Sequence, residues 1–105
     1  MNIKEVQQES HQIAVDKGFW EEGKRNLSEL LMLVVSELGE ACEALRKDNR
    51  QINKIWRKDA FEDELADAVI RIFDLAESEG IDLEWQIRQK LDYNKTRPKK
   101  HGKKF

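Results

Sequence analysis

Between residues 27 and 45, apolar side chains recur at every third or fourth position, which is the repeat of one face of an α-helix. Within this stretch, residues 30–35 are six apolar residues in a row, so hydrophobic side chains surround the helix instead of forming one stripe. A helix that is apolar on every side is normally covered on every side. The sequence therefore predicts an α-helical fold in which this helix is central.

Three further segments carry the helical repeat, and none alternates with a period of two, so we expect no strand. Asn26 and Asp59 each precede a glutamate by three residues, as in a capping box, and Asp82 is a candidate cap for a last helix. A single proline, Pro98, and five glycines in 105 residues favour long helices with short connections. The prediction is an all-α, antiparallel four-helix bundle-like fold with helices over about residues 2–17, 27–47, 59–79 and 83–93.

The charges divide the chain into two parts. Residues 1–94 contain all 21 acidic residues and 13 of the 19 basic ones, which gives a net charge of −8. Residues 95–105 contain the other six basic residues and no acid. We expect one helical domain over 1–94 and a basic C-terminal tail over 95–105. The acidic domain would suit cations, and the basic tail would suit anions.

With Cys42 as the only cysteine, the chain has no intramolecular disulfide framework, which suits a reducing compartment. Cys42 lies on the apolar stripe of residues 27–45, where we expect it to be buried. The first residues lack the apolar core of a signal peptide, and no run reaches the roughly 18 apolar residues of a transmembrane helix. We expect a cytoplasmic protein without a membrane partner. The tail is short and has no base-reading element, so nucleic acid is not expected as a partner either.

Two pairs of acids border the apolar stripes of neighbouring predicted helices: Glu37 with Glu40, and Glu64 with Asp67. Residues three apart share a helix face, so the pairs converge if the two helices pack antiparallel. Four facing carboxylates repel one another, and a hard divalent cation with oxygen ligands would relieve that repulsion. The alternative is that these acids belong to a solvated helix face.

The spacing Glu37-x-x-Glu40, then 23 residues, then Glu64-x-x-Asp67 resembles the signature of the MazG-like all-α nucleoside triphosphate pyrophosphohydrolases. The text around these acids and the closing segment from Tyr93 are also similar to short, single-domain members of that family. The resemblance covers essentially the whole chain. It implies a MazG-type fold whose helices are contributed to an oligomeric bundle.

The resemblance further implies an enzyme that hydrolyses a (d)NTP between the α- and β-phosphates, giving a (d)NMP and pyrophosphate. Such an activity suits house-cleaning of the nucleotide pool. Mg²⁺, with Mn²⁺ as the alternative, would be bound by Glu37, Glu40, Glu64 and Asp67, which would also be the catalytic residues. Some relatives carry an extra acid where this chain has Ser36, so the resemblance assigns no general base.

Substrate-binding residues are predicted at both ends of the chain. His11 lies nine residues before Trp20, a spacing similar to the histidine and tryptophan that contact the base in the dCTP-pyrophosphatase branch. Asn94, Lys95 and Arg97 are expected to bind phosphate oxygens through charge-assisted hydrogen bonds. The segment 44–47 lacks an aromatic residue that this branch carries, so no preference for one base is implied.

Two other functions fit the same residues. One is a non-catalytic helical oligomerisation module, and the other is a related phosphohydrolase acting on another phosphorylated nucleotide such as phosphoribosyl-ATP. In every case the apolar run 30–35 predicts a homo-oligomer, because a bundle of this size covers one stripe but not a whole circumference. We expect a tetramer in preference to a dimer.

Overall fold

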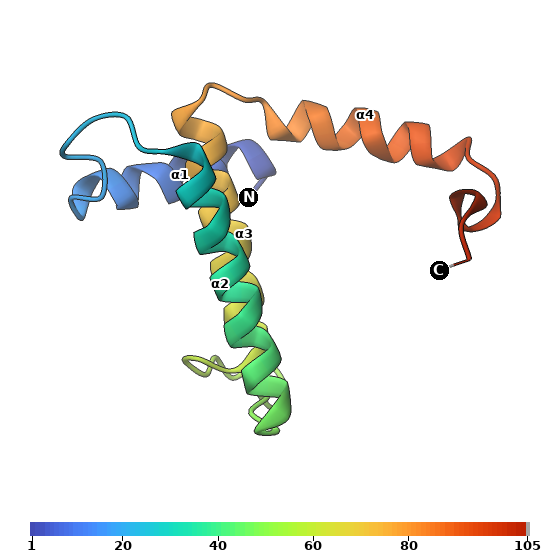
Figure 1. Ribbon diagram of the computed structural model, residues 1–105, viewed down its shortest axis with the longest axis horizontal. Helices are drawn as coiled ribbons and strands as arrows, with labels where there is room; N and C mark the ends of the chain where they lie inside the picture. The colour runs from blue at the N-terminus through green and yellow to red at the C-terminus, as the bar shows by residue number, and fades with distance from the viewer. Residues whose placement is uncertain (105) are drawn as a thin grey trace.

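The structure is a computed structural model, and it describes residues 1–104 (Figure 1). Within them lie four α-helices, a short 3₁₀ helix and no strand. The predicted all-α class and the four helices are confirmed, and each helix end lies within two residues of its predicted position. The last residue of the expected tail, 105, lies outside the described residues. The elements are α1 (Ile3–Asp16), α2 (Leu27–Arg46), α3 (Phe61–Ser78), α4 (Leu83–Lys95) and η1 (Lys99–Gly102).

Side-chain caps explain where two of the helices begin. The Asn26 side chain accepts a hydrogen bond from the backbone N–H of Glu29 at 3.1 Å, and Asp82 accepts one from Trp85 at 3.0 Å. These bonds satisfy N–H groups that have no partner inside the helix. The capping roles predicted for Asn26 and Asp82 are therefore confirmed.

The cap predicted at Asp59 is wrong. Helix α3 begins two residues later, and its N-cap residue, Ala60, makes no side-chain capping bond. Asp59 has a φ of +65°, a left-handed conformation that aspartate tolerates better than most residues. Its backbone N–H donates to the carboxylate of Asp63 at 2.9 Å. Asp59 thus turns the chain into the helix instead of capping it.

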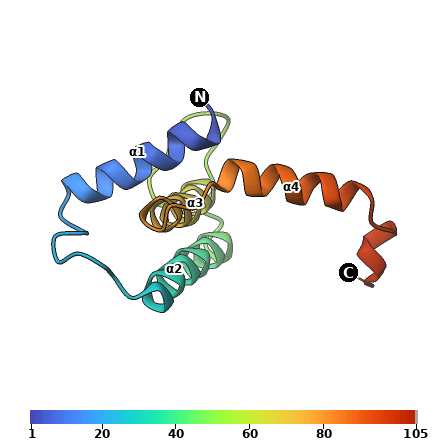
Figure 2. The ribbon, with the colours of Figure 1, turned by 90° about the horizontal axis from the view of Figure 1, so that it is seen from above.

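Helices α2 and α3 lie side by side and antiparallel, and α1 packs across α3 (Figures 1 and 2). The contact between α2 and α3 is close because most buried apolar residues are small. Among the described residues, the buried apolar side chains are Leu30, Val34, Ala41, Ala44, Ala60, Ala68 and Ala76. None of the large side chains that the structure describes is fully buried, so the core of one chain is thin.

Helix α4 does not complete a four-helix bundle within the chain. It projects from the end of α3, away from the α2–α3 pair. It extends to a different side of this pair from α1 (Figures 1 and 2). It meets the rest of the chain near its own first turn, where Glu84 accepts a hydrogen bond from the backbone N–H of Lys4 at 3.3 Å. None of its residues is buried. Helical periodicity in the sequence predicts which residues of α4 share a face. It does not predict the direction in which α4 leaves α3, which the turn at Gly80 (φ +68°) sets.

The radius of gyration reflects this extended arm. It is 16.1 Å, whereas a compact chain of this length has about 13 Å. No helix within residues 1–104 combines the length and the apolar character needed to cross a bilayer.

Candidate functional site

Carboxylates from α2 and α3 meet in a hollow toward the end of this helix pair that lies away from α4. Glu37 on α2 and Glu64 and Asp67 on α3 each offer an oxygen atom within 4.8 Å of the others. The spacing of three residues places Glu64 and Asp67 on one face of α3, and the antiparallel packing sets Glu37 opposite them. Glu64 is only 5% exposed, and Glu37 and Asp67 are half-buried.

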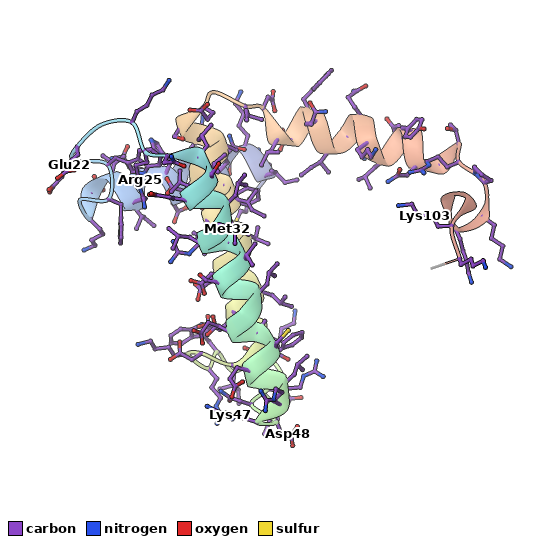
Figure 3. All side chains as sticks on the ribbon, viewed as in Figure 1. Glu22, Arg25, Met32, Lys47, Asp48 and Lys103 are labelled. Carbon is purple, nitrogen blue, oxygen red and sulfur yellow. The ribbon has the colours of Figure 1, made fainter. Side chains whose placement is uncertain are left out.

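The hollow around these acids has a volume of about 470 Å³. Glu40 lines the same hollow but is exposed and does not belong to the group of three within 4.8 Å. Lys47 also lines it, at the end of α2, where Figure 3 places its side chain. Four polar lining residues were not predicted from the sequence: Glu43, Lys47, Asn49 and Asp59. Glu43 and Lys47 follow Glu40 at helical steps of three and four residues, and that spacing could have identified them.

Burial and crowding of the acids shift their pKa values. Burial raises the pKa of Glu64 to about 7, helped by a hydrogen bond with Glu37 and by the charges of Glu37 and Asp67. Burial also raises the pKa of Asp67, as do the nearby charges of Asp63 and Glu37. The carboxyl groups of Glu64 and Asp67 are therefore harder to ionise here than in water.

One arginine offsets part of this charge. The guanidinium Nε of Arg71 lies 3.0 Å from Oε1 of Glu37, an ion pair between α3 and α2. Arg71 also lowers the pKa of Asp67, against the larger effects that raise it. It lies four residues after Asp67 on the same face, and that spacing is the signal by which the sequence could have identified it.

The predicted pair His11 and Trp20 forms a second cluster near the start of α2. Their rings meet edge to face with centroids 5.3 Å apart. Both rings are held by Asp74 of α3, whose Oδ1 lies 2.7 Å from His11 Nδ1 and accepts a hydrogen bond from Trp20 Nε1 at 3.0 Å. The guanidinium of Arg25 lies 5.4 Å from the centroid of the Trp20 ring. A pocket of about 230 Å³ opens beside these groups.

Asp74 was not predicted, because it belongs to neither acid pair and its partners lie 54 and 63 residues away in the sequence. Because the Asp74 carboxylate lies beside Nδ1 of His11, it favours a proton on that nitrogen. Nε2 of the ring is then left for other partners. The cluster therefore presents an oriented imidazole beside a large aromatic ring.

A third hollow, of about 320 Å³, joins the two clusters. Glu37 and Asp67 of the acidic hollow line it together with Arg25 and Asp74 of the aromatic cluster. The surface between the clusters carries the apolar side chains of Phe19 and Ile70.

The predicted phosphate-binding residues of the C-terminal segment lie elsewhere. Asn94 and Lys95 are at the end of α4, and Arg97 follows it, at the far end of the projecting arm (Figure 1). Lys103 likewise lies away from the α2–α3 pair (Figure 3). None of these residues lines the acidic hollow of its own chain.

Comparison of this chain with models of protein families, with curated proteins and with solved structures gave no match.

Proposed function

We propose that this protein is a Mg²⁺-dependent nucleotide pyrophosphohydrolase of the MazG-like type, which converts a (d)NTP to a (d)NMP and pyrophosphate. The observation that carries the proposal is the convergence of Glu37, Glu64 and Asp67 within 4.8 Å in an open polar hollow. The burial of Glu64 favours this function over an oligomerisation module, because a solvated acidic face gives no reason to bury a carboxyl group.

The donor set fits a hard divalent cation. All three groups are carboxylates, which Mg²⁺ and Mn²⁺ prefer. A bound cation would offset the burial and the acidic neighbours that raise the pKa of Glu64. Glu37, Glu64 and Asp67 would hold the ion, and Glu40 lies on the rim where it can join them. When bound, the ion would neutralise phosphate charge and polarise the phosphoryl group under attack.

The residues between the two clusters would orient the nucleotide. His11 and Trp20 would receive the base, with Asp74 fixing the imidazole and the indole in place. Arg25 and Arg71 line the joining hollow, where they would contact sugar or phosphate oxygens. An extended nucleotide would then span the distance from the aromatic cluster to the acids, with its phosphates at the acidic end. The physiological role would be removal of unwanted nucleotides from the pool.

The test is a panel of ribo- and deoxynucleoside triphosphates with Mg²⁺ or Mn²⁺, scored by product. Monophosphate plus pyrophosphate is expected, whereas diphosphate plus inorganic phosphate would overturn the proposed cleavage position. Glu40→Gln and Asp67→Asn should each reduce kcat at least 100-fold with the helical circular dichroism unchanged. Glu9→Gln, an exposed acid on α1, is the matched control and should leave kcat unchanged. Full activity in both site variants would remove the acids from the mechanism.

A further inference from the structure

We propose that Arg71 binds the phosphate group of the substrate that lies nearest the sugar, and that its ion pair with Glu37 couples the binding of this phosphate to that of the divalent cation. The inference deepens the proposed function and rests on it for the assignment of the cation to the acidic hollow. It adds a residue that links the cation end of the site to the nucleotide end.

Arg71 lies between the two clusters in a single row along α3. Asp67, Arg71 and Asp74 follow steps of four and three residues, so they lie on one face of the helix. Asp67 lines the acidic hollow, and Asp74 holds the two rings of the aromatic cluster. With a rise of about 1.5 Å per residue, Arg71 lies about 6 Å along the axis from Asp67 and about 4.5 Å from Asp74. It therefore stands between the groups proposed to bind the cation and those proposed to bind the base.

The guanidinium group of Arg71 uses only part of its bonding capacity. Its Nε donates a hydrogen bond to Oε1 of Glu37 at 3.0 Å, and the side chain is 40% exposed. Within residues 1–104 this is the one hydrogen bond that the guanidinium makes to a protein group. Arginine has five N–H donors in a rigid fork, so both Nη groups are left to bind an oxyanion through two parallel bonds. Arg71 lines the joining hollow of about 320 Å³, which has room for such an anion.

Two other basic side chains beside these hollows have different partners. The guanidinium of Arg25 lies over the Trp20 ring, 5.4 Å from its centroid. Lys47 lines the acidic hollow, where its Nζ lies 3.6 Å from the carboxylate of Glu43, which is not one of the three convergent acids. Among the described residues, only Arg71 forms an ion pair with one of those three acids. Arg71 is therefore the basic residue whose position can respond to a cation.

The ion pair sets two positive groups in competition for one carboxylate. The proposed cation and the guanidinium both draw on Glu37, whose side chain is only 15% exposed, so water screens their mutual repulsion incompletely. A phosphate group that contacts both has the opposite charge to each of them and replaces this repulsion by attraction. Cation and phosphate should therefore increase the affinity of the site for each other, and linkage requires the same factor in both directions.

The order of the groups identifies which phosphate is bound. The proposed function puts the base at the aromatic cluster and the phosphates at the acidic end. Along this line, the first phosphate after the sugar reaches Arg71 before the later ones reach the acids. The phosphate beside Arg71 is then the α-phosphate, which stays with the monophosphate after the proposed cleavage. The arginine fork would hold the nonbridging oxygens of this group in position.

The first test measures the coupling without any assay of activity. Isothermal titration calorimetry gives the affinity of the full-length protein for Mg²⁺, with and without inorganic phosphate. Without phosphate, Arg71→Gln should bind Mg²⁺ about three-fold more tightly than wild type, because the competing charge is gone. Phosphate should raise the Mg²⁺ affinity of wild type about five-fold and that of Arg71→Gln by no more than about two-fold. Arg88→Gln, which loses an ion pair with Asp92 on α4, is the matched control and should behave as wild type.

Phosphate also binds free Mg²⁺ in solution, but to the same extent in every sample, so the comparison between variants isolates the contribution of the protein. Arg71→Lys keeps the charge and loses the fork. It should bind Mg²⁺ alone as wild type does and should show a coupling between those of wild type and Arg71→Gln. If Arg71→Gln bound Mg²⁺ no more tightly than wild type, or kept the whole effect of phosphate, the coupling through Arg71 would be overturned.

The second test uses the two products of the proposed reaction as inhibitors at saturating Mg²⁺. In Arg71→Gln, the inhibition constant of the monophosphate should rise about ten-fold, whereas that of pyrophosphate should change by less than about two-fold. Arg71→Lys should recover part of the loss. An equal loss for both products would contradict the assignment of Arg71 to the α-phosphate. Wild-type protein that couples Mg²⁺ to phosphate as expected but hydrolyses no triphosphate would contradict the proposed function and leave the role of Arg71 in binding supported.

Discussion

At the scale of single residues, Glu64 is the side chain whose environment departs most from that of an ordinary acid. It combines burial with two acidic neighbours, Glu37 and Asp67, and both circumstances disfavour its charged form. Such an arrangement costs stability above the pKa of Glu64 unless a cation is bound. The proposed metal site can therefore be tested through folding stability, independently of catalysis.

The first prediction concerns the pH dependence of stability without divalent metal. The pKa of Glu64 is about 7 in the folded protein, above its usual value of 4.5, so the folded state binds this proton more tightly than the unfolded chain. The resulting stabilisation is complete below about pH 4.5 and is lost as the pH rises through 7. Glu64→Gln should therefore be more stable than wild type at pH 8, by about 1–2 kcal/mol, and the gain should vanish near pH 4.

Thermal unfolding between pH 4 and pH 8 in EDTA measures this difference. Millimolar Mg²⁺ should raise the wild-type midpoint at pH 8 and leave the Glu64→Gln midpoint nearly unchanged. Glu9→Gln is again the control, because it removes one acid from an exposed helix face. A Glu64→Gln protein that is equally destabilised at every pH would mean that the carboxyl group has a structural role only.

The second prediction concerns Asp74, which holds both His11 and Trp20. Asp74→Ala removes the acceptor from two donors, so the rings lose their common orientation. We expect KM for the best triphosphate to rise about ten-fold, with kcat changed less than two-fold, since the proposed function places the reacting phosphate at the acidic hollow. Asp74→Asn keeps one acceptor and should recover part of the loss.

Steady-state kinetics on the same substrate panel separate the two constants. Asp16→Ala, whose carboxylate accepts from Gln12 on the exposed side of α1, is the matched control. If Asp74→Ala lowered kcat and left KM unchanged, the aromatic cluster would not be a binding site for the substrate.

At the scale of the helices, the sequence contains most of what determines the fold locally. The apolar repeat and the side chains of Asn26 and Asp82 fix where α2 and α4 begin, and Gly18 (φ +89°) lies just past the end of α1. Convergence of Glu37, Glu64 and Asp67 could also be anticipated, because it needs only helical spacing and antiparallel packing.

What the sequence did not reveal depends on contacts between distant segments. The expected burial of Cys42 was wrong, since residues on one apolar stripe do not all face the same chain, and Cys42 belongs to an exposed apolar row of α2 with Leu31, Val35, Leu38 and Leu45. The start of α3 was misplaced because Asp59 adopts a left-handed turn that its motif does not encode. Asp74 escaped notice because its partners are assembled only by packing of α1 on α3.

The third prediction belongs to the C-terminal segment as an element. Replacing Lys95, Lys99 and Lys103 by alanine should raise KM for a triphosphate about ten-fold and leave the helical content unchanged, because this segment contributes charge and almost no core. The effect should shrink in high salt, as expected for exposed charges. Lys4→Ala with Lys54→Ala is a control with charges removed elsewhere. An unchanged KM would exclude the tail from the substrate site.

At the scale of the whole molecule, two observations point the same way. The chain is more extended than a compact domain of its length, and its buried apolar residues are mostly alanine. A chain with so thin a core gains little by folding alone. The apolar side chains that would supply the missing burial are present, but they lie along α4, on the exposed apolar row of α2 and on a matching row of α3 formed by Leu65, Val69 and Ile72.

The last prediction is that the wild-type protein has no stable monomer at micromolar concentration. Sedimentation equilibrium should give at least twice the 12.4 kDa mass of one chain, and a tetramer would consist of two such pairs. Val35→Ala with Val69→Ala should weaken association at least ten-fold, because each substitution removes apolar area from both sides of a two-fold interface. Met32→Ala is the matched control, since Met32 is exposed on α2 but lies off the apolar row.

In the assembled wild type, the thiol of Cys42 should react with a maleimide at least ten-fold more slowly than in the Val35→Ala, Val69→Ala protein diluted to its monomer. A stable, active species at 12.4 kDa, or a Cys42 thiol that reacts equally fast in both proteins, would show that the rows on α2 and α3 do not form the interface.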